Sequence, residues 1–265
     1  MDGGQQVDAT FDRDSRSVGE AVVSEHLWSR GLSRIDYILA THADADHIDG
    51  LNDIARNFRV GAALVARTPA TDFEFSKFSA TCNSRGVPIY SIGAGDVLRF
   101  GAAKVRVLWP PATAIMEAPS QNNDSLVLLL QFGARRVLFT GDIEDTAEKE
   151  ILTRYKTDLS DLDPLGSNLR ADVVKVAHHG SKTSSSEGFV TATQSHIAVI
   201  SVGQTSVFGH PHHDVVERWK KSGAQVITTG ENGMISLTTD GRDLGLTTFV
   251  GSESSRADGR RVVPY

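Results

Sequence analysis

The chain has 265 residues, of which 40% are hydrophobic, and a formal net charge of -6 at pH 7. This length and composition are typical of a soluble globular protein with one large domain or two small ones. We expect no membrane-spanning helix, because no run of about 18 apolar residues occurs, and no export signal, because the N-terminus lacks a basic segment followed by an apolar one.

The charge and the cysteine content narrow the chemistry. A net charge of -6 argues against a broad basic surface that binds nucleic acid through many phosphates. It does not exclude a phosphodiester substrate, because bound cations and a few local Lys or Arg residues can dock one phosphate. Cys82 is the single cysteine, so we expect no internal disulfide and no cysteine-rich zinc site. Any metal must therefore be held by His and Asp.

Helices and strands alternate in the first part of the chain. After a polar loop over residues 3–16, apolar spacing predicts helices and strands in turn. The predicted helices are 18–28, 47–58 and 73–85, and the predicted strands are 34–40, 60–65 and 87–91.

The middle of the chain changes character, because short β-type runs follow one another between Gly, Pro or Asn turns. These runs are 97–100, 105–109, 125–132 and 136–140, and their close succession predicts antiparallel pairing. Beyond them we predict helices over 144–155 and 214–221, a polar loop over 157–169, and strands over 173–177, 197–202, 226–229, 234–238 and 244–249, with a short helix between the first two of these strands.

Two groups of strands with helices between them predict an α+β sandwich of sheets flanked by helices. We expect a single domain over residues 1–251. The polar residues 252–265 are predicted to form a mobile tail.

The stretch from Thr41 to Gly50 is the strongest functional signal. His42, Asp44, Asp46 and His47 follow directly on the predicted strand 34–40. A strand that ends in imidazole and carboxylate groups brings them to the edge of a sheet, where they can bind Zn²⁺, Mn²⁺ or a related cation. The alternative is a solvated acidic turn with accidental histidines.

Three later strands also end in polar groups. Asp142 follows strand 136–140, His178 and His179 follow strand 173–177, and His210, His212 and His213 come after strand 197–202. If these strands lie side by side, their ends share one edge and supply enough ligands for two cations. Taken singly, each has a plainer interpretation: a Gly-Asp turn, a hydrogen-bonded histidine pair, and a surface loop before a helix.

Two further stretches are candidate substrate contacts. Asn122, Asn123 and Ser125 precede a predicted strand and can place an amide or hydroxyl at the same edge, although a simple turn has the same sequence. Ser181 and Lys182 follow the histidine pair, where they can bind a phosphate or cap the next helix.

The order of these motifs resembles the metallo-β-lactamase fold superfamily, whose hallmark is a His-x-His-x-Asp-His turn followed by a His, an Asp and a His. This sequence has His42-x-Asp44-x-Asp46-His47, and residues 122–125 stand where the superfamily has its mid-chain histidine. Together with Ala177-His178-His179-Gly180-Ser181 and Gly209-His210-Pro211-His212, these departures are most similar to the C-terminal hydrolase domain of the competence DNA-uptake protein ComEC.

This resemblance implies a four-layer αββα hydrolase with one or two divalent cations, Mn²⁺ or Zn²⁺. Opening strands that normally precede Asp2-Gly3-Gly4 are expected to be missing. Carried over by residue, the resemblance implies that His42 and Asp44 hold one cation, Asp46 and His47 the second, and that Asp142 bridges them. His178 or His179 completes the second site, and the other contacts the substrate phosphate. Asp44 in place of a histidine favours Mn²⁺ or weaker occupancy over tightly held Zn²⁺.

The function implied is hydrolysis of DNA during competence DNA uptake, by attack of a metal-bound hydroxide on phosphorus. In the mechanism we expect, Asp46 accepts the proton of that water, His178 is the second catalytic candidate, and Asn122, Asn123, Ser125, Ser181, Lys182, His210 and His212 contact substrate. Two alternatives stay open: hydrolysis of a small ester, lactone or phosphodiester, and a non-catalytic binding domain of the same fold.

The partners implied are DNA, most simply single-stranded, or a small phosphodiester. In the ComEC proteins the domain is joined to a membrane channel, which this sequence does not contain. The expected location is the outer face of the bacterial inner membrane if the chain is such a domain, and the cytoplasm otherwise.

Overall fold

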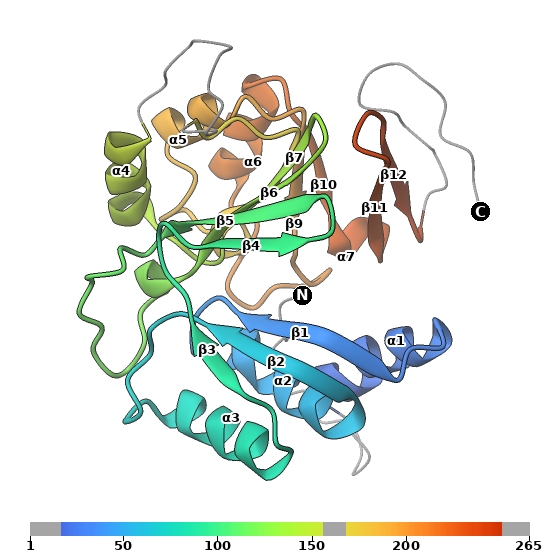
Figure 1. Cartoon of the computed structure of the whole chain (residues 1–265). Coiled ribbons are helices and arrows are strands. Elements are labelled where there is room, and N and C mark those ends of the chain that lie inside the picture. The colour runs from blue at the N-terminus through green and yellow to red at the C-terminus, as the bar shows by residue number, and fades with distance from the viewer. Residues whose placement is uncertain (1–16, 156–167, 251–265) are drawn as a thin grey trace. The chain divides into compact units, whose positions relative to one another are not determined.

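A computed structural model describes residues 17–155 and 168–250. The predicted loop 3–16, the tail 252–265 and nearly all of the predicted loop 157–169 lie outside the described residues. The chain forms two compact units, which are considered separately (Figure 1). The first unit comprises residues up to 94 and 110–126, and the second comprises 95–109 and the residues from 127 onward.

The first unit is built on a parallel sheet with the strand order β1-β2-β3. Parallel strands need long crossovers, and here each crossover contains a helix. The strands are β1 (Arg34–Ala40), β2 (Arg59–Val65) and β3 (Ile89–Ser91). The helices are the π-helix η1 (Gly19–Ser24), α1 (Glu25–Ser29), α2 (Ala45–Asn57), α3 (Phe73–Ser84) and the 3-10 helix η2 (Asn122–Asp124).

The core of the first unit lies between one face of this sheet and helices α2 and α3. Alternate strand residues such as Ile38 and Ala63 point to that face, as a period of two requires. Ile48, on α2, and Phe78, on α3, pack against them and are fully buried. This packing fixes the end of β1 against the beginning of α2, where the first candidate ligands lie.

The second unit contains a mixed sheet with the order β10-β9-β8-β7-β6-β5-β4. Strands β4 to β7 are antiparallel neighbours, which confirms the predicted pairing, and β7 to β10 run parallel. The strands are β4 (Val97–Phe100), β5 (Ala103–Trp109), β6 (Val127–Phe132), β7 (Arg135–Phe139), β8 (Val173–Lys175), β9 (Ile197–Ile200) and β10 (Gln225–Thr228). The change of direction at β7 brings the carboxyl ends of β7, β8 and β9 to one edge.

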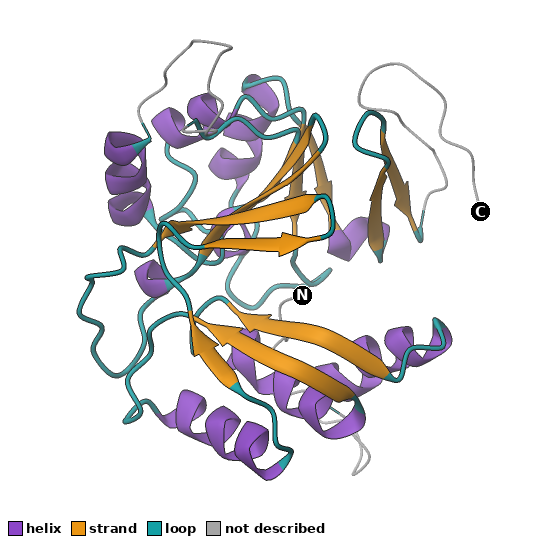
Figure 2. Cartoon of the chain, viewed as in Figure 1, coloured by secondary structure: helices purple, strands orange, loops and turns teal. Residues whose placement is uncertain are grey.

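Both faces of this second sheet are covered (Figure 2). On one face the helices α4 (Asp145–Arg154), α5 (Glu187–Thr193) and α6 (His213–Lys221) bury a core that includes Trp219 and Phe189. On the other face, Val137 and Val173 pack with Leu244 and Leu246 of the antiparallel hairpin β11 (Ile235–Thr239) and β12 (Leu244–Thr248). The short helix α7 (Thr229–Asn232) leads into that hairpin.

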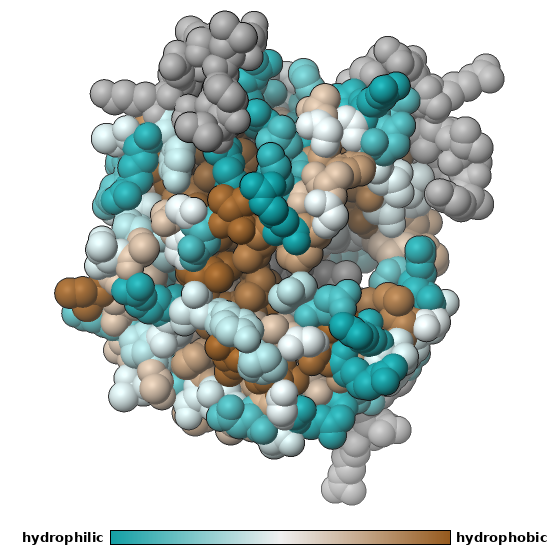
Figure 3. All heavy atoms as spheres, in the orientation of Figure 1, coloured by the Kyte–Doolittle hydropathy of each residue, from teal (hydrophilic) through white to brown (hydrophobic). Residues whose placement is uncertain are grey.

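The surface of the described residues mixes polar and apolar side chains. The face drawn in Figure 3 shows teal and brown atoms interspersed. Large apolar side chains are exposed on several separate elements, among them Phe73, Ile115 and Phe208. Scattered exposed apolar residues are normal on soluble domains, so exposure alone marks none of them as functional.

Several predicted strands are shorter in the structure, and two of these differences occur beside candidate site residues. The predicted strand 173–177 ends at Lys175, because the 3-10 turn η3 (Ala177–Gly180) begins two residues later. The predicted strand 125–132 begins at Val127, because residues 122–124 form the helix η2. In both places the chain leaves the sheet to present polar groups.

Candidate functional site

In the first unit, the turn between β1 and α2 brings two histidines together. β1 ends at Ala40, and Asp44 occupies the position before α2 with an extended backbone. The rings of His42 and His47 lie with their centroids 4.2 Å apart, and both residues are almost fully buried. Their Nε2 atoms face carboxylates: His42 lies 3.5 Å from Asp44 Oδ2, and His47 lies 3.7 Å from Asp46 Oδ2.

Hydroxyl groups hold the other ring nitrogen of these histidines. Thr41 Oγ1 lies 3.1 Å from His42 Nδ1 and 3.4 Å from His47 Nδ1, and Ser125 Oγ lies 3.2 Å from His42 Nδ1. The backbone of Thr41 also accepts a hydrogen bond from Leu126, which fixes Ser125 beside the ring. A partner on Nδ1 that orients the ring and leaves Nε2 for the cation is the usual support of a metal-binding histidine.

His42 passes a test for metal binding within this unit. Its Nε2 is buried and has no hydrogen-bond partner among the described residues. A buried polar atom without a hydrogen bond is costly unless another ligand satisfies it. A divalent cation shared with the Asp44 carboxylate satisfies both groups, so the donor set of this turn fits a metal.

A chain of hydrogen bonds through Ser120 and Asp72 also supports the turn between β1 and α2. The backbone N–H of Ala43 donates to Ser120 Oγ at 3.3 Å, and the N–H of Ser120 donates to Asp72 Oδ2 at 2.9 Å. Asp72 is buried and also caps α3 by accepting from the N–H of Phe75 at 2.9 Å. These residues flank a shallow hollow of about 220 Å³ beside the turn, lined by Ala43, Asp44, Ala45, Asp46, Asp72, Phe73, Glu74 and Pro119.

The mid-chain stretch lies near His42 in the first unit, and its contact with substrate stays a prediction. Ser125 was predicted to contact substrate; it is 0% exposed, and its hydroxyl contacts the His42 ring. Asn122 and Asn123 are half-buried on η2, and their substrate contact stays a prediction. Burial raises the pKa of Asp124, while its hydrogen bond from Gln121 and the charge of His42 oppose that shift.

In the second unit, Asp142 and His179 face each other. Asp142 follows β7 after Gly141, whose positive φ of 53° suits glycine, and is nearly fully buried. Its Oδ2 lies 3.3 Å from His179 Nε2, and Lys175 Nζ lies 3.4 Å from its Oδ1.

The tautomer of His179 follows from its other contact. Nδ1 lies 2.6 Å from the backbone oxygen of Ser201. That oxygen can only accept, so Nδ1 carries a proton, and Nε2 of the neutral ring is an acceptor. An acceptor nitrogen at 3.3 Å from a carboxylate oxygen requires a positive charge between them, either a proton or a cation. Each unit therefore carries an imidazole and a carboxylate suited to a divalent cation: Asp46 and His47 in the first, Asp142 and His179 in the second.

The turn that carries His179 has an unusual backbone. His178 and His179 have positive φ values of 47° and 51°, and Gly180 follows at 81°. Non-glycine residues in this region cost about 1–3 kcal/mol each and cluster at functional sites. The turn is held by hydrogen bonds from His178 N to the Gly141 oxygen at 3.2 Å and from His212 N to the Gly180 oxygen at 2.8 Å. A Cβ at Gly180 would lie 2.8 Å from Pro211 Cβ, so glycine is required there.

His178 points to a different set of partners from His179. Its Nδ1 lies 3.3 Å from Glu144 Oε1 and 3.5 Å from Thr183 Oγ1. Its ring also meets the ring of His210 edge-on, with centroids 5.7 Å apart. Burial lowers the pKa of His210, and the charges of His178 and His179 lower it further.

The remaining predicted substrate contacts are placed within the second unit. His212 occupies the position before α6, and 41% of its side chain is exposed. Ser181 is buried and its hydroxyl lies 3.0 Å from Thr183 Oγ1, whereas Lys182 is exposed. Contact of these residues with substrate stays a prediction.

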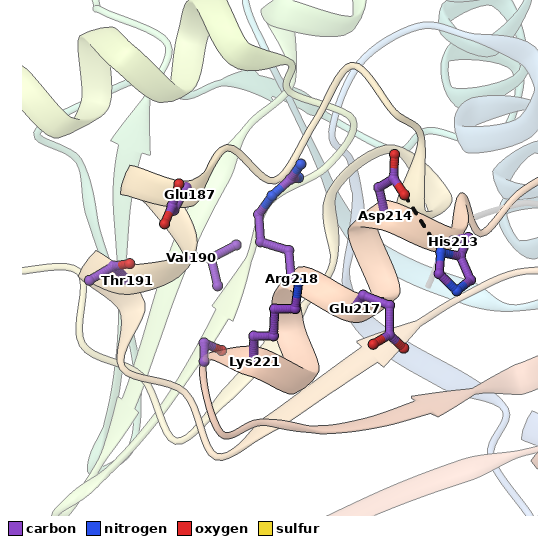
Figure 4. Close-up of a pocket in the computed structure, with 9 residues that line it drawn as sticks. Glu187, Val190, Thr191, His213, Asp214, Glu217, Arg218 and Lys221 are labelled. Atoms are coloured by element: carbon purple, nitrogen blue, oxygen red, sulfur yellow. Dashed lines mark ion pairs between the residues drawn. The ribbon is translucent and has the colours of Figure 1, made fainter.

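A separate hollow of about 600 Å³ lies between α5 and α6 (Figure 4). Its lining carries side chains of both signs: Glu187, Asp214 and Glu217 are acidic, and Arg218 and Lys221 are basic. Arg218 is already engaged, because it donates to the Ser185 oxygen at 2.6 Å. The offsetting charges give this hollow no clear preference for an anion or a cation.

Sequence reasoning missed the residues that support the candidate ligands. Thr41, Lys175 and Glu144 were not singled out, and Ser125 was given a different role. Thr41 directly precedes His42 and Glu144 lies two residues after Asp142, so closeness in sequence to a candidate ligand could have identified both. For Lys175, the signal was its position two residues before the end of a predicted strand, which does not specify a partner.

The fold is that of a class of metallo-hydrolases, and the described residues include a candidate metal site. Residues 7–204 match the metallo-beta-lactamase superfamily, and the chain belongs to this family. The α+β class and the metallo-β-lactamase fold predicted from the sequence are thus confirmed.

The chain is similar to competence proteins within this family. It is 32% identical over 83% of its length to ComE operon protein 3 of Bacillus subtilis, covering 26% of that protein. It is 25% identical over 86% of its length to competence protein ComA of Neisseria gonorrhoeae, covering 28% of that protein. The predicted resemblance to ComEC-type proteins is confirmed, and the chain spans about a quarter of the length of these relatives.

A solved structure adds no argument about activity. CmlA, a diiron beta-hydroxylase from Streptomyces venezuelae, superposes with a TM-score of 0.48 at 16% identity, over 73% of this chain and 43% of that one. Among the described residues of this chain, no helix has both the length and the apolar character needed to cross a membrane.

Proposed function

We propose that this chain is a metal-dependent phosphodiesterase that hydrolyses DNA, as part of competence DNA uptake. The observation that supports it best is the His42 ring, whose Nδ1 is held by two hydroxyls while its buried Nε2 has no hydrogen-bond partner among the described residues. This arrangement supports a metal ligand over a structural histidine, because a hydroxyl partner on Nδ1 is the usual support of a metal-binding ring. The similarity to competence proteins supports DNA as the substrate.

The ligand set that we propose is the one that the family resemblance implies. His42 and Asp44 hold one divalent cation, Asp46 and His47 hold a second, and Asp142 and His179 complete the set. Three of these six groups are carboxylates, which makes the set richer in oxygen than one built mainly from histidines and favours Mn²⁺ over Zn²⁺. When bound, such a cation supplies positive charge that activates water at neutral pH and offsets the charge developing on a phosphate.

The chain's own residues perform the remaining steps. Asp46 accepts the proton of the attacking water. Of the two adjacent histidines, we assign His179 as the ligand, because its Nδ1–H donates to Ser201 and its Nε2 faces the Asp142 carboxylate at 3.3 Å. His178 is held at Nδ1 by the Glu144 carboxylate and positions the substrate phosphate through its remaining nitrogen. In the intact protein we propose that this domain acts beside a membrane channel, at the outer face of the inner membrane.

The test combines metal analysis with cleavage assays on the purified chain. Single- and double-stranded DNA, a generic phosphodiester and a lactone are incubated with Mn²⁺, with Zn²⁺ and with chelator. We expect DNA cleavage that chelator abolishes and Mn²⁺ restores. Cleavage that is indifferent to chelation contradicts a metal mechanism, and turnover of the lactone alone favours a small-molecule hydrolase.

Asp46→Ala is the diagnostic variant and Asp49→Ala is its control. Asp49 lies on the same helix but pairs with Lys77 at 2.5 Å, away from the histidines. We expect Asp46→Ala to abolish cleavage with an unchanged circular dichroism spectrum, and Asp49→Ala to retain it. Wild-type cleavage by Asp46→Ala would refute the assignment.

A further inference from the structure

Three aromatic rings form a row in the second unit, from the His178 turn out to solvent. The ring of His210 meets His178 edge-on at 5.7 Å between centroids. The ring of Phe208 stacks on the ring of His210, with 6.1 Å between the centroids and an angle of 25° between the planes. The last ring, that of Phe208, is 67% exposed, and it is the stacking on His210 rather than the exposure that sets it apart from other exposed apolar side chains.

The backbone of this loop is fixed by one hydroxyl. Ser206 Oγ accepts from the N–H of Phe208 at 3.3 Å and from the N–H of His210 at 3.2 Å. The N–H of Gly209 donates to the Ser206 oxygen at 3.2 Å, and its φ of 71° allows the tight bend. The Phe208 ring is therefore held outward by the loop, rather than exposed because the loop lacks internal contacts.

An outward aromatic ring matters because charge does not explain how this chain would bind DNA. The formal net charge is -6, so the overall charge of the chain does not attract a polyanion over a long range. Proteins that bind single strands combine backbone contacts with aromatic side chains on which bases stack. Stacking needs no positive charge and every base offers a flat face, so one exposed ring next to the phosphate-binding residues suits a single strand.

We propose that Phe208 is a stacking platform for a nucleobase of a single-stranded DNA substrate, adjacent to the nucleotide whose phosphate meets His178. The proposal rests on the proposed function and deepens it, because it selects a strand with unpaired bases over small phosphodiesters and duplexes. In a duplex the bases are stacked on one another, so their faces are unavailable to the ring.

The test compares two oligonucleotides that differ only in their bases. One is an intact single strand, and the other has the same sugar-phosphate length with abasic residues. Binding is measured by fluorescence anisotropy without added metal, and cleavage is measured with Mn²⁺. We expect the wild type to bind the intact strand more tightly, and Phe208→Ala to lower this preference about 5- to 150-fold, the range for loss of one aromatic–base stack.

Matched variants separate stacking from damage to the loop. Phe208→Trp keeps a ring and should keep the preference. Val207→Ala changes a neighbouring apolar residue that is 79% exposed but has no ring, and should leave the preference unchanged. Equal loss of affinity for both strands in Phe208→Ala, or an unchanged preference, overturns the proposal.

The outcomes also distinguish this inference from the proposed function. Loss of preference in Phe208→Ala together with metal-dependent cleavage by the wild type supports both. The same loss without cleavage by the wild type under any metal condition supports stacking and contradicts the nuclease function. Cleavage with a base preference that is independent of Phe208 contradicts the stacking alone, and neither binding nor cleavage contradicts both.

Discussion

Asp72 is not one of the proposed metal ligands, but we expect that removing its carboxylate strongly destabilises the first unit. One oxygen caps α3 through the N–H of Phe75, and the other accepts from the N–H of Ser120, whose hydroxyl in turn supports Ala43 in the site turn. Loss of a helix cap costs about 1 kcal/mol. A buried N–H left without an acceptor costs about 1–3 kcal/mol.

Asp72→Ala is therefore expected to lower the free energy of unfolding by about 2–4 kcal/mol. For a chain of this size the melting temperature should fall by about 4–16 °C. Asp72→Asn keeps one carbonyl oxygen for the cap and loses only the Ser120 contact, so its cost should be about 1–3 kcal/mol.

The assay is urea unfolding followed by circular dichroism, with Asp36→Ala as the control. The Asp36 side chain is 72% exposed and pairs with Arg34 at 3.0 Å, a surface ion pair whose loss costs less than about 1 kcal/mol. If Asp72→Ala loses no more stability than Asp36→Ala, the argument from buried hydrogen bonds is refuted.

Three further outcomes follow from buried polar groups. Ser125→Ala, which removes a hydroxyl from His42, should weaken Mn²⁺ binding about 10- to 100-fold by isothermal titration calorimetry, and a change below about twofold contradicts the supporting role. Mn²⁺ at about 100 times its Kd should raise the free energy of unfolding by about 2.7 kcal/mol, and EDTA should reverse this in a thermal melt; an unchanged melting temperature argues against a bound cation. Burial raises the pKa of Glu148, which accepts from the N–H groups of Ser185 and Ser186. Its contribution to stability is thus fully present below the ordinary glutamate pKa of about 4.3 and is lost as pH rises through the raised value. The free energy of unfolding of Glu148→Gln should therefore depend less on pH above about pH 4 than that of the wild type. A parallel pH dependence of the two proteins would show that Glu148 is not responsible.

The elements of the fold were predictable because the hydrophobic pattern is strongly periodic. The predicted strand 34–40 coincides with β1, and the helix predicted over 73–85 is α3 with one residue fewer. The parallel neighbours β7, β8 and β9 were not predictable, since an apolar run specifies a buried strand but does not specify which strand lies beside it.

The candidate ligands were predictable for a different reason, namely that chemistry-bearing residues are concentrated at strand ends. Which histidine of the pair at 178–179 serves which purpose could not be read from the sequence. The two histidines differ in their partners: His179 contacts the backbone oxygen of Ser201, and His178 contacts the carboxylate of Glu144. Both partners are distant in sequence, and their residue types do not mark them as partners of a histidine. A left-handed backbone at both positions, which aims adjacent side chains apart, has no signature in the residue types.

The single hydroxyl of Thr41 constrains the hydrogen positions of two imidazoles at once. Its oxygen lies near Nδ1 of both His42 and His47, and a hydroxyl has one hydrogen but two lone pairs. If it donates to one ring, that ring carries its hydrogen on Nε2 and is blocked as a ligand there. Both rings can bind through Nε2 only when both Nδ1 atoms donate and the threonine hydrogen turns away. The direction of the threonine hydrogen therefore decides whether one histidine of the turn or both can bind through Nε2.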